Sequence, residues 1–222
     1  GALFDTNEVE LAIADMDGVL PEDFHSTTNF TTHILLHDQW IEVENLEMDC
    51  GIRVWQEDGV WRAATCPMHQ VKKGDALVVG FQGVRVSPHD DEQRDDQEFR
   101  FMSNDVSSER PKRRMISHAA DAIQRAKEEG RRVLFVGGPA IVHSGSAPLL
   151  AKLIEDGWID VLFAGNALAA HDIEANMLGT SLGVDLNTGS SGARGHTHHL
   201  RAINRIRRAG SIAVAVENGL IT

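Results

Sequence analysis

Val133-Leu-Phe-Val-Gly-Gly-Pro139 consists of four apolar residues followed by two glycines and a proline. A second, largely apolar run from Ile159 to Ala164 ends in a similar way at Gly165-Asn166. The residues between them, from about Ala147 to Asp156, have helical periodicity and stop at Gly157. Buried strands that alternate with helices and end in glycine are typical of a parallel α/β sheet. The sequence therefore predicts such a sheet in the second half of the chain.

Helical patterns flank these two strands. From about Ser107 to Gly130 the chain carries an apolar stripe at 3.6-residue spacing, formed by Met115, Ile116, Ala119, Ala120, Ile123 and Ala126. Asn166 is placed to cap a helix that reaches Leu178, and further helices are predicted over 200–208 and 212–216. The helix over 200–208 is basic and amphipathic. A membrane-surface role stays open for it, but a packed helix with an exposed cationic face is the more common arrangement.

The first half shows a different pattern, in which short alternating runs are separated by turn residues. Strands are predicted over 33–36, 40–43, 52–55, 76–79 and 83–87. Several short strands at such spacing predict a small barrel or sandwich. The acidic stretch from Pro88 to Gln97 predicts a solvated loop or linker. We therefore expect a small β-rich domain over residues 1–102 and an α/β domain over residues 103–222.

Composition narrows the class of protein. Of the 222 residues, 42% are hydrophobic and 24% are charged, which is typical of a soluble globular chain. No window approaches 18 consecutive apolar residues, so no membrane span is expected. Residues 1–102 carry 21 Asp and Glu against 7 Lys and Arg, an acidic balance that argues against nucleic-acid binding. Two cysteines make no disulfide framework, which favours a reducing compartment and a cytoplasmic location.

The carboxyl ends of the two predicted parallel strands are the first candidate site, because open α/β sheets bind ligands there. The loop from Gly137 to Ser146 offers flexible backbone and hydroxyls to a phosphate, although it is not a G-x-G-x-x-G motif. A tight turn with no ligand is an equal alternative. His171 and Asp172 follow the second strand, either as nucleotide or substrate contacts or as part of a solvated first helical turn.

The histidines and cysteines give weaker indications of a metal site or a catalytic site. Gly195-His-Thr-His-His199 resembles a metal-binding string, but no carboxylate accompanies it at a fitting spacing, so a ligand-lining loop or a surface loop is favoured. Cys66 and His69 are a single Cys/His pair without further ligands nearby in the sequence, and we predict no metal site. Asp49 and Cys50 are candidates for an acid, a base or a thiolate. Since no neighbouring residue in the sequence activates Cys50, a buried structural cysteine is the favoured interpretation.

Seven strings of this sequence occur in the same order in one protein family. They are Phe24-His-Ser-Thr-Thr-Asn29, Glu47-Met-Asp-Cys-Gly51, Val106-Ser-Ser-Glu-Arg-Pro111, Val136-Gly-Gly-Pro-Ala-Ile-Val-His-Ser-Gly-Ser146, Ala164-Gly-Asn-Ala-Leu-Ala-Ala-His-Asp-Ile-Glu174, Gly179-Thr-Ser-Leu-Gly183 and Gly195-His-Thr-His-His-Leu-Arg-Ala-Ile-Asn204. Together they make nearly the whole chain similar to archaeal-type ornithine cyclodeaminase. The same module, known as the LOR/SDH conserved region, forms the C-terminal part of cyanobacterial arginine dihydrolase/ornithine cyclodeaminase.

The resemblance implies a small β-rich domain and a Rossmann-like domain related to deoxyhypusine synthase, with bound NAD. It implies conversion of the substrate L-ornithine to L-proline and ammonia, through a hydride that NAD borrows and returns. Relatives of this fold commonly form homo-oligomers. Three alternatives stay open: a lysine/saccharopine-type NAD(P) oxidoreductase, a non-catalytic module that senses NAD or an amino acid, and, more distantly, a metal hydrolase built on His196, His198 and His199.

The resemblance also suggests roles for individual residues. The cofactor-binding candidates are Gly137, Gly138, Pro139, Ser144, Gly145, Gly165, Asn166 and Ala167. The candidates for proton handling in catalysis are Asp49, Cys50, His143 and Asp172. The candidates for substrate binding are Asn29, Glu109 and His171, of which Asn29 and Glu109 are expected to line a cleft between the domains.

Two departures from the family pattern are visible. His25 stands where the family usually has Tyr or Trp. The chain stops at Thr222, whereas the family continues with a cysteine-bearing strand and a Gly-Ser, Asp-Asp-Gly-Pro loop. The first residue is Gly1 rather than Met, with no leader. We therefore expect a C-terminally truncated module, a piece of a longer protein.

Overall fold

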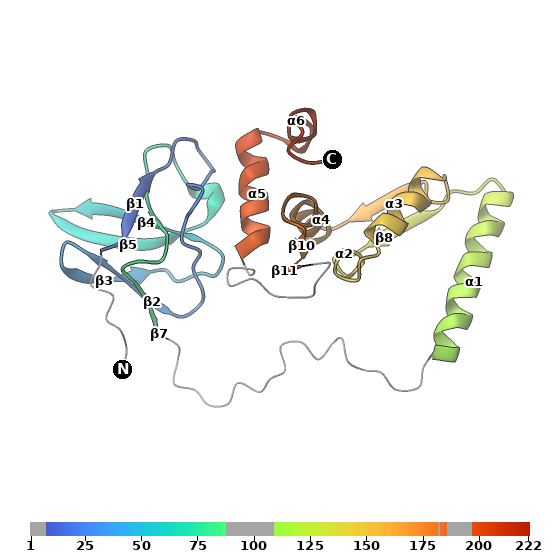
Figure 1. Ribbon diagram of the computed structural model, residues 1–222, viewed down its shortest axis with the longest axis horizontal. Coiled ribbons are helices and arrows are strands. Elements are labelled where there is room, and N and C mark those ends of the chain that lie inside the picture. Colours follow the sequence, from blue (N-terminus) through green and yellow to red (C-terminus); the bar gives the residue numbers. More distant parts are fainter. Residues whose placement is uncertain (1–7, 88–108, 182, 186–196) are drawn as a thin grey trace. The chain divides into compact units, whose positions relative to one another are not determined.

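The computed structural model describes residues 8–87, 109–181, 183–185 and 197–222 (Figure 1). Contacts divide the chain into two compact units. The first unit is Gly1–Asp90 together with Ile173–Thr222, and the second unit is Asp91–Asp172. The domain boundary that we predict after residue 102 and the predicted loop over 88–97 lie outside the described residues.

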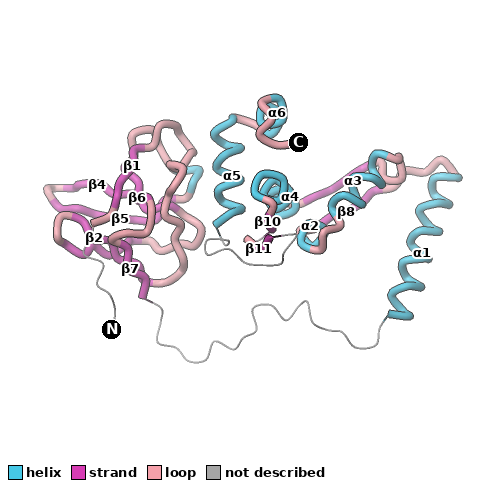
Figure 2. Tube along the Cα trace, in the orientation of Figure 1, coloured by secondary structure: helices cyan, strands magenta, loops and turns pink. Residues whose placement is uncertain are grey.

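The first unit contains a seven-stranded sheet, whose strands are magenta in Figure 2. The strand order in this sheet is β1-β6-β4-β5-β3-β2-β7. Its strands are β1 (Glu10–Ile13), β2 (Thr31–Leu36), β3 (Gln39–Glu44), β4 (Gly51–Glu57), β5 (Val60–Cys66), β6 (Ala76–Val79) and β7 (Val84–Ser87). β3 pairs with β5 in parallel, and the other pairs are antiparallel. The β-rich first half that the sequence predicts is confirmed.

Two hairpins follow from turn residues that the sequence displays. His37 and Asp38 join β2 to β3, and Asp58 and Gly59 join β4 to β5. All four have positive φ, between 49° and 80°. Two-residue turns of this kind match the twist of antiparallel strands and favour Asp and Gly. The hairpins place alternate residues inward, where Ile34, Leu36, Val43, Ile52, Val54, Ala63 and Val78 form most of a buried core.

The C-terminal part of the first unit packs against this β-rich part. It contains the short pair β10 (Thr180–Ser181) and β11 (Val184–Asp185) and the helices α5 (His198–Ala209) and α6 (Ile212–Glu217). Leu200 of α5 joins a second buried cluster that includes Leu20, Phe24 and Leu77. Asn204, which is 4% exposed, forms two hydrogen bonds of 2.9 Å with the backbone of Leu20.

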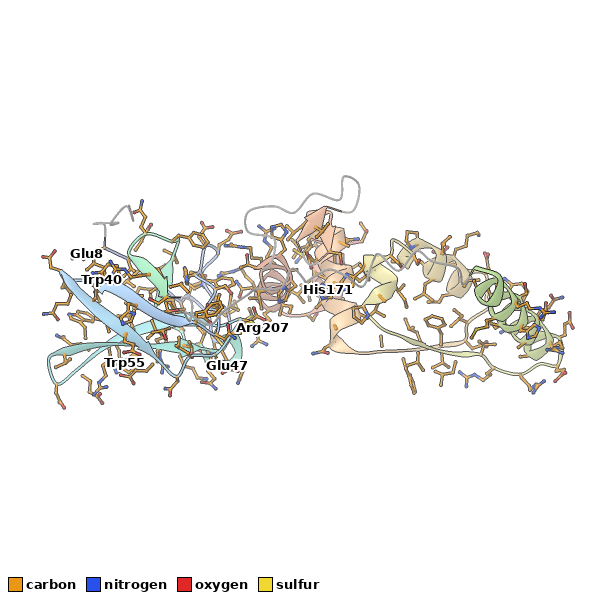
Figure 3. All side chains as sticks on the ribbon, turned by 90° about the horizontal axis from the view of Figure 1, so that it is seen from below. Glu8, Trp40, Glu47, Trp55, His171 and Arg207 are labelled. Carbon is orange, nitrogen blue, oxygen red and sulfur yellow. The ribbon has the colours of Figure 1, made fainter. Side chains whose placement is uncertain are left out.

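The basic face of α5 is directed onto an acidic loop, residues 15–23. Arg208 pairs with Asp15 at 2.7 Å, and this hydrogen bond lowers the pKa of the Asp15 carboxyl. Arg207, which is labelled in Figure 3, donates to the carbonyl of Gly18. Gly18 has a φ of +70°, and a Cβ at this position would collide with the Arg207 guanidinium. The predicted packed helix with an exposed cationic face is confirmed, because Arg205, Arg207 and Arg208 are exposed. The structure adds that Arg207 and Arg208 have partners in the loop over 15–23.

The second unit contains the predicted alternation of helices and strands. Its elements are α1 (Glu109–Glu128), β8 (Leu134–Gly137), α2 (Ala140–His143), α3 (Ala147–Glu155), β9 (Val161–Ala164) and the first part of α4 (Asn166–Leu178). β8 and β9 are parallel, with Leu134 opposite Val161 and Gly137 opposite Ala164. The α/β class is confirmed. Among the described residues, no helix is both long and apolar enough to span a membrane.

The prediction that these two strands are buried is wrong for most of their residues. The exposed fractions are 52% for Leu134, 73% for Val136 and 60% for Phe163. Within the described residues this sheet has only two strands, so each strand has an unpaired edge and little covers the faces. Part of the apolar stripe of α1 is also exposed, at Met115 and Ile116.

We predict that Asn204→Ala destabilises the first unit by about 2 kcal/mol, because it leaves the buried N–H of Leu20 without its hydrogen bond and the C=O of Leu20 with only the 3.4 Å bond from Arg208. Urea denaturation followed by circular dichroism measures this loss. Arg205→Ala is the matched control on the same helix, since it removes a solvent-exposed pair with Glu22 at 3.1 Å. The Arg205→Ala control should lower the free energy of unfolding by only about 0.5 kcal/mol. Equal losses in the two variants would contradict the proposed importance of the Asn204 hydrogen bonds.

Candidate functional site

Two glycines lie side by side at the carboxyl edge of the parallel strands. Gly138 follows β8 and Gly165 follows β9, and the register pairs the preceding residues, Gly137 and Ala164. A Cβ at Gly138 or at Gly165 would meet no atom within 4 Å. A Cβ at Gly137 would instead come within 3.0 Å of Ile141, so Gly137 serves close packing. The backbone of Gly138 and of Gly165 is therefore open to a ligand.

Helix α4 begins immediately after this edge, at Asn166, with Ala167 as its second residue. The backbone N–H groups of a first helical turn have no partner within the helix and carry partial positive charge. They are suited to a phosphate group, as are the open glycines beside them. The residues present therefore fit a phosphate group, such as the diphosphate of a dinucleotide.

The loop that follows β8 forms a tight local turn. Pro139 precedes α2, and Gly145 has a φ of +70° between α2 and α3. The Ser144 hydroxyl lies 2.9 Å from the Ser146 hydroxyl and 3.2 Å from the carbonyl of Ile141. Both alternatives that the sequence left open, a phosphate loop and a tight turn, are compatible with this geometry.

Two histidines of the second unit lie against each other. The rings of His143, at the end of α2, and His171, on α4, have centroids 4.7 Å apart at an angle of 62°. His171 is buried and is labelled in Figure 3, whereas Asp172 is exposed. The sequence proposed both histidines for the site but gave no signal that they touch.

The first unit carries a separate cluster around Asp49 and Cys50. Thr27 exchanges backbone hydrogen bonds with this turn, and its hydroxyl accepts from the N–H of Cys50 at 3.0 Å. Asp49 has a φ of +65°. Its carboxylate lies 3.8 Å from Nε2 of His199, the second residue of α5. Asn29 is exposed in the same N-terminal segment.

Cys50 is a neutral thiol at physiological pH. Its side chain is buried, and burial, followed by the negative charge of Glu47, raises the pKa of the Cys50 thiol to about 11. Burial also raises the pKa of Cys66. These environments favour the structural interpretation of Cys50, because the nucleophilic form of cysteine is the thiolate.

A buried polar network in the first unit was missed by the sequence analysis. Glu174 of α4 is fully buried, and its Oε1 accepts hydrogen bonds from the Thr180 hydroxyl at 2.8 Å and from the Gly183 N–H at 2.9 Å. The Thr180 oxygen also lies 2.8 Å from Nδ1 of His198. The available signal was that Glu174, Thr180 and His198 each lie within one of the recurring strings.

The structure says little about Glu109 and about the metal site considered at His196, His198 and His199. Glu109 begins α1, and its side chain lies outside the described part of the chain, as does His196. Among the described residues, no group of three or more His, Cys, Asp or Glu is arranged to hold a metal ion.

Open glycines at the ends of parallel strands, followed directly by a helix, define a mixed α/β protein with a Rossmann-type region. Two family models match this chain. One, for the first region of the C-terminal part of ArgZ-like arginine dihydrolase, matches residues 31–116. The other, for the Rossmann fold of the same C-terminal part, matches residues 117–222. The chain belongs to this ArgZ-like C-terminal family.

Named relatives agree with this assignment. The chain is 51% identical over 222 residues to an ornithine cyclodeaminase of Methanothermobacter thermautotrophicus, covering 100% of this chain and 53% of the relative. It is 40% identical over 219 residues to the bifunctional arginine dihydrolase/ornithine cyclodeaminase AgrE of Nostoc sp., covering 98% of this chain and 31% of that protein. The chain thus spans about half the length of the archaeal relative.

A solved structure supports the fold. The ternary complex of AgrE with ornithine and NAD+ matches with a TM-score of 0.79 and 36% identity, covering 100% of this chain and 30% of that chain. The resemblance inferred from the seven strings and the predicted α/β fold class are both confirmed. The predicted domain bounds stay a prediction. The roles of individual site residues stay predictions.

We predict that neither cysteine reacts quickly with Ellman's reagent in the folded chain at pH 8. The raised pKa keeps Cys50 protonated until the pH approaches about 11, and burial blocks access to the sulfur. Urea should release two thiols per chain, which serves as the control. One rapidly reacting thiol in the folded chain at pH 8 would contradict this prediction and revive a thiolate role.

Proposed function

We propose that this chain is the NAD-binding and substrate-binding part of an ornithine cyclodeaminase that converts L-ornithine to L-proline and ammonia. The observation that carries this proposal is the match, over 100% of the chain, to a protein solved with ornithine and NAD+. The identity of 51% to an archaeal ornithine cyclodeaminase supports it. The open glycines at the edge of β8 and β9 supply an independent physical argument for a nucleotide.

The second unit would hold the cofactor. Gly138 and Gly165 offer backbone that a diphosphate can approach, and Asn166 and Ala167 offer the first N–H groups of α4. Gly137, Pro139, Ser144 and Gly145 would shape the loop beside them. When bound, NAD+ supplies a hydride acceptor for the substrate Cα and later returns the hydride, so the reaction has no net oxidation.

The polar candidate residues would handle the amino acid. A substrate with two ammonium groups requires carboxylates, and Asp49 presents one beside His199. His143 and His171 supply a partly buried imidazole pair, with Asp172 as a further candidate. Asn29 and Glu109 stay proposed substrate contacts. For Cys50, the raised pKa of about 11 favours a structural role over the proton handling that the resemblance suggests.

We predict that Gly138→Val weakens NAD binding at least tenfold, which corresponds to about 1.4 kcal/mol. The new side chain would occupy the space that a phosphate needs. It should not disturb folding, since a Cβ there meets no atom within 4 Å. Isothermal titration with NAD+ measures the affinity, and circular dichroism checks the fold. Unchanged affinity in a folded variant would contradict the placement of the cofactor.

The reaction itself can be tested with α-deuterated L-ornithine and catalytic NAD+. We predict that the proline formed keeps its deuterium, because the abstracted hydride returns to the same carbon skeleton. Mass spectrometry of proline measures this. Accumulation of NADH in proportion to product would instead favour a lysine/saccharopine-type oxidoreductase. Saturable NAD binding without product, in this chain and in a longer chain extended past Thr222, would favour a sensing module.

A further inference from the structure

The buried network of the first unit fixes the direction of its hydrogen bonds. Oε1 of Glu174 receives two donors, the hydroxyl of Thr180 and the N–H of Gly183. A carboxylate oxygen that receives two donors carries no proton of its own. Glu174 and Thr180 are 0% and 8% exposed, so water does not compete for these bonds.

This direction determines which nitrogen of His198 carries hydrogen. A threonine hydroxyl has a single proton, and here that proton is directed to Glu174. The Thr180 oxygen therefore faces Nδ1 of His198, 2.8 Å away, as an acceptor. Nδ1 must be the donor, so in the neutral ring Nε2 holds the lone pair. Among the described residues, Nε2 of His198 forms no hydrogen bond.

We propose that His198 is the catalytic base that removes a proton from the substrate's α-ammonium group, and that Thr180 and Glu174 are positioning residues that hold its ring and its tautomer. This inference rests on the proposed function, because it names the base of that reaction. The ammonium N–H bond breaks, its electron pair stays on the amine nitrogen, and the proton forms an N–H bond at Nε2. The neutral amine then allows hydride to leave Cα.

The chain distinguishes His198 from its neighbours as a base. The imidazolium formed at His198 keeps its Nδ1–H bond to Thr180, whose proton faces the carboxylate of Glu174, so the positive charge meets a negative one through one hydroxyl. His199, next in sequence, lies against the carboxylate of Asp49 and so belongs to a different contact. The pKa of the Cys50 thiol is raised to about 11, so this thiol is already protonated at neutral pH and cannot act as the base.

The tautomer can be measured without any turnover. Nitrogen-15 NMR of the histidine side chains in the whole chain should show His198 protonated at Nδ1 and not at Nε2. Thr180→Ser should keep this pattern because it keeps the hydroxyl. Thr180→Val, which has a similar shape, should lose it. An Nε2–H ring in the unmodified protein, or the same tautomer in all three proteins, would overturn the positioning role.

Kinetics test the catalytic role in the same proteins. We expect His198→Gln to lower kcat by at least 100-fold while KM and NAD affinity change by less than about threefold, a loss typical of a missing base. Thr180→Val should lower kcat about tenfold, and Thr180→Ser should restore it. His69→Gln, an exposed histidine outside the network, is the control and should match the unmodified protein.

The two proposals fail in different ways. Proline formation that His198→Gln leaves within tenfold of the unmodified rate would overturn the role of His198 and leave the cyclodeaminase proposal standing. A parallel loss of NAD affinity in His198→Gln would also overturn it, since the residue would then be structural. Absence of proline with the unmodified protein, despite an Nδ1–H ring, would overturn the proposed function while the positioning of His198 by Thr180 stood.

Discussion

Docking of α5 against the segment around Leu20 is the interaction on which the first unit depends. Asn204 satisfies both backbone polar groups of Leu20, and Leu200 fills the apolar cluster beside it. The arginines of the same helix neutralise the acidic loop over 15–23. Because α5 begins with His198 and His199, this docking also brings the two histidines to the β-rich part, where Asp49 lies.

Local signals in the sequence predicted most of the elements. The positive-φ turns at 37–38 and 58–59 use residues that tolerate that conformation, so the hairpins could be placed without tertiary information. The glycines after β8 and β9 marked the ends of parallel strands in the same way. The prediction that these strands are buried was wrong. Apolar side chains show that a strand can be buried, but they do not show whether another element covers it. Val136 is apolar and 73% exposed.

The candidate site was predictable only in part. Gly138 and Gly165 were found because a strand end has a sequence signature, and their open Cβ positions agree with the role proposed for them. The contact of His143 with His171 and the network of Glu174, Thr180 and His198 depend on residues that are distant in sequence and adjacent in space. A single sequence does not reveal such pairs, since neither spacing nor composition encodes them.

The first unit is built from two segments that are distant in the sequence, and this sets an order in which its parts can fold. The hairpins close over loops of two residues and can form as soon as they leave the ribosome. The contact between Leu20 and Asn204 joins residues 184 positions apart, so it closes a much longer loop and must wait until synthesis has passed Asn204. The second unit is synthesised in between. During synthesis, the surface of the β-rich part that receives Leu200 therefore stays uncovered until α5 emerges.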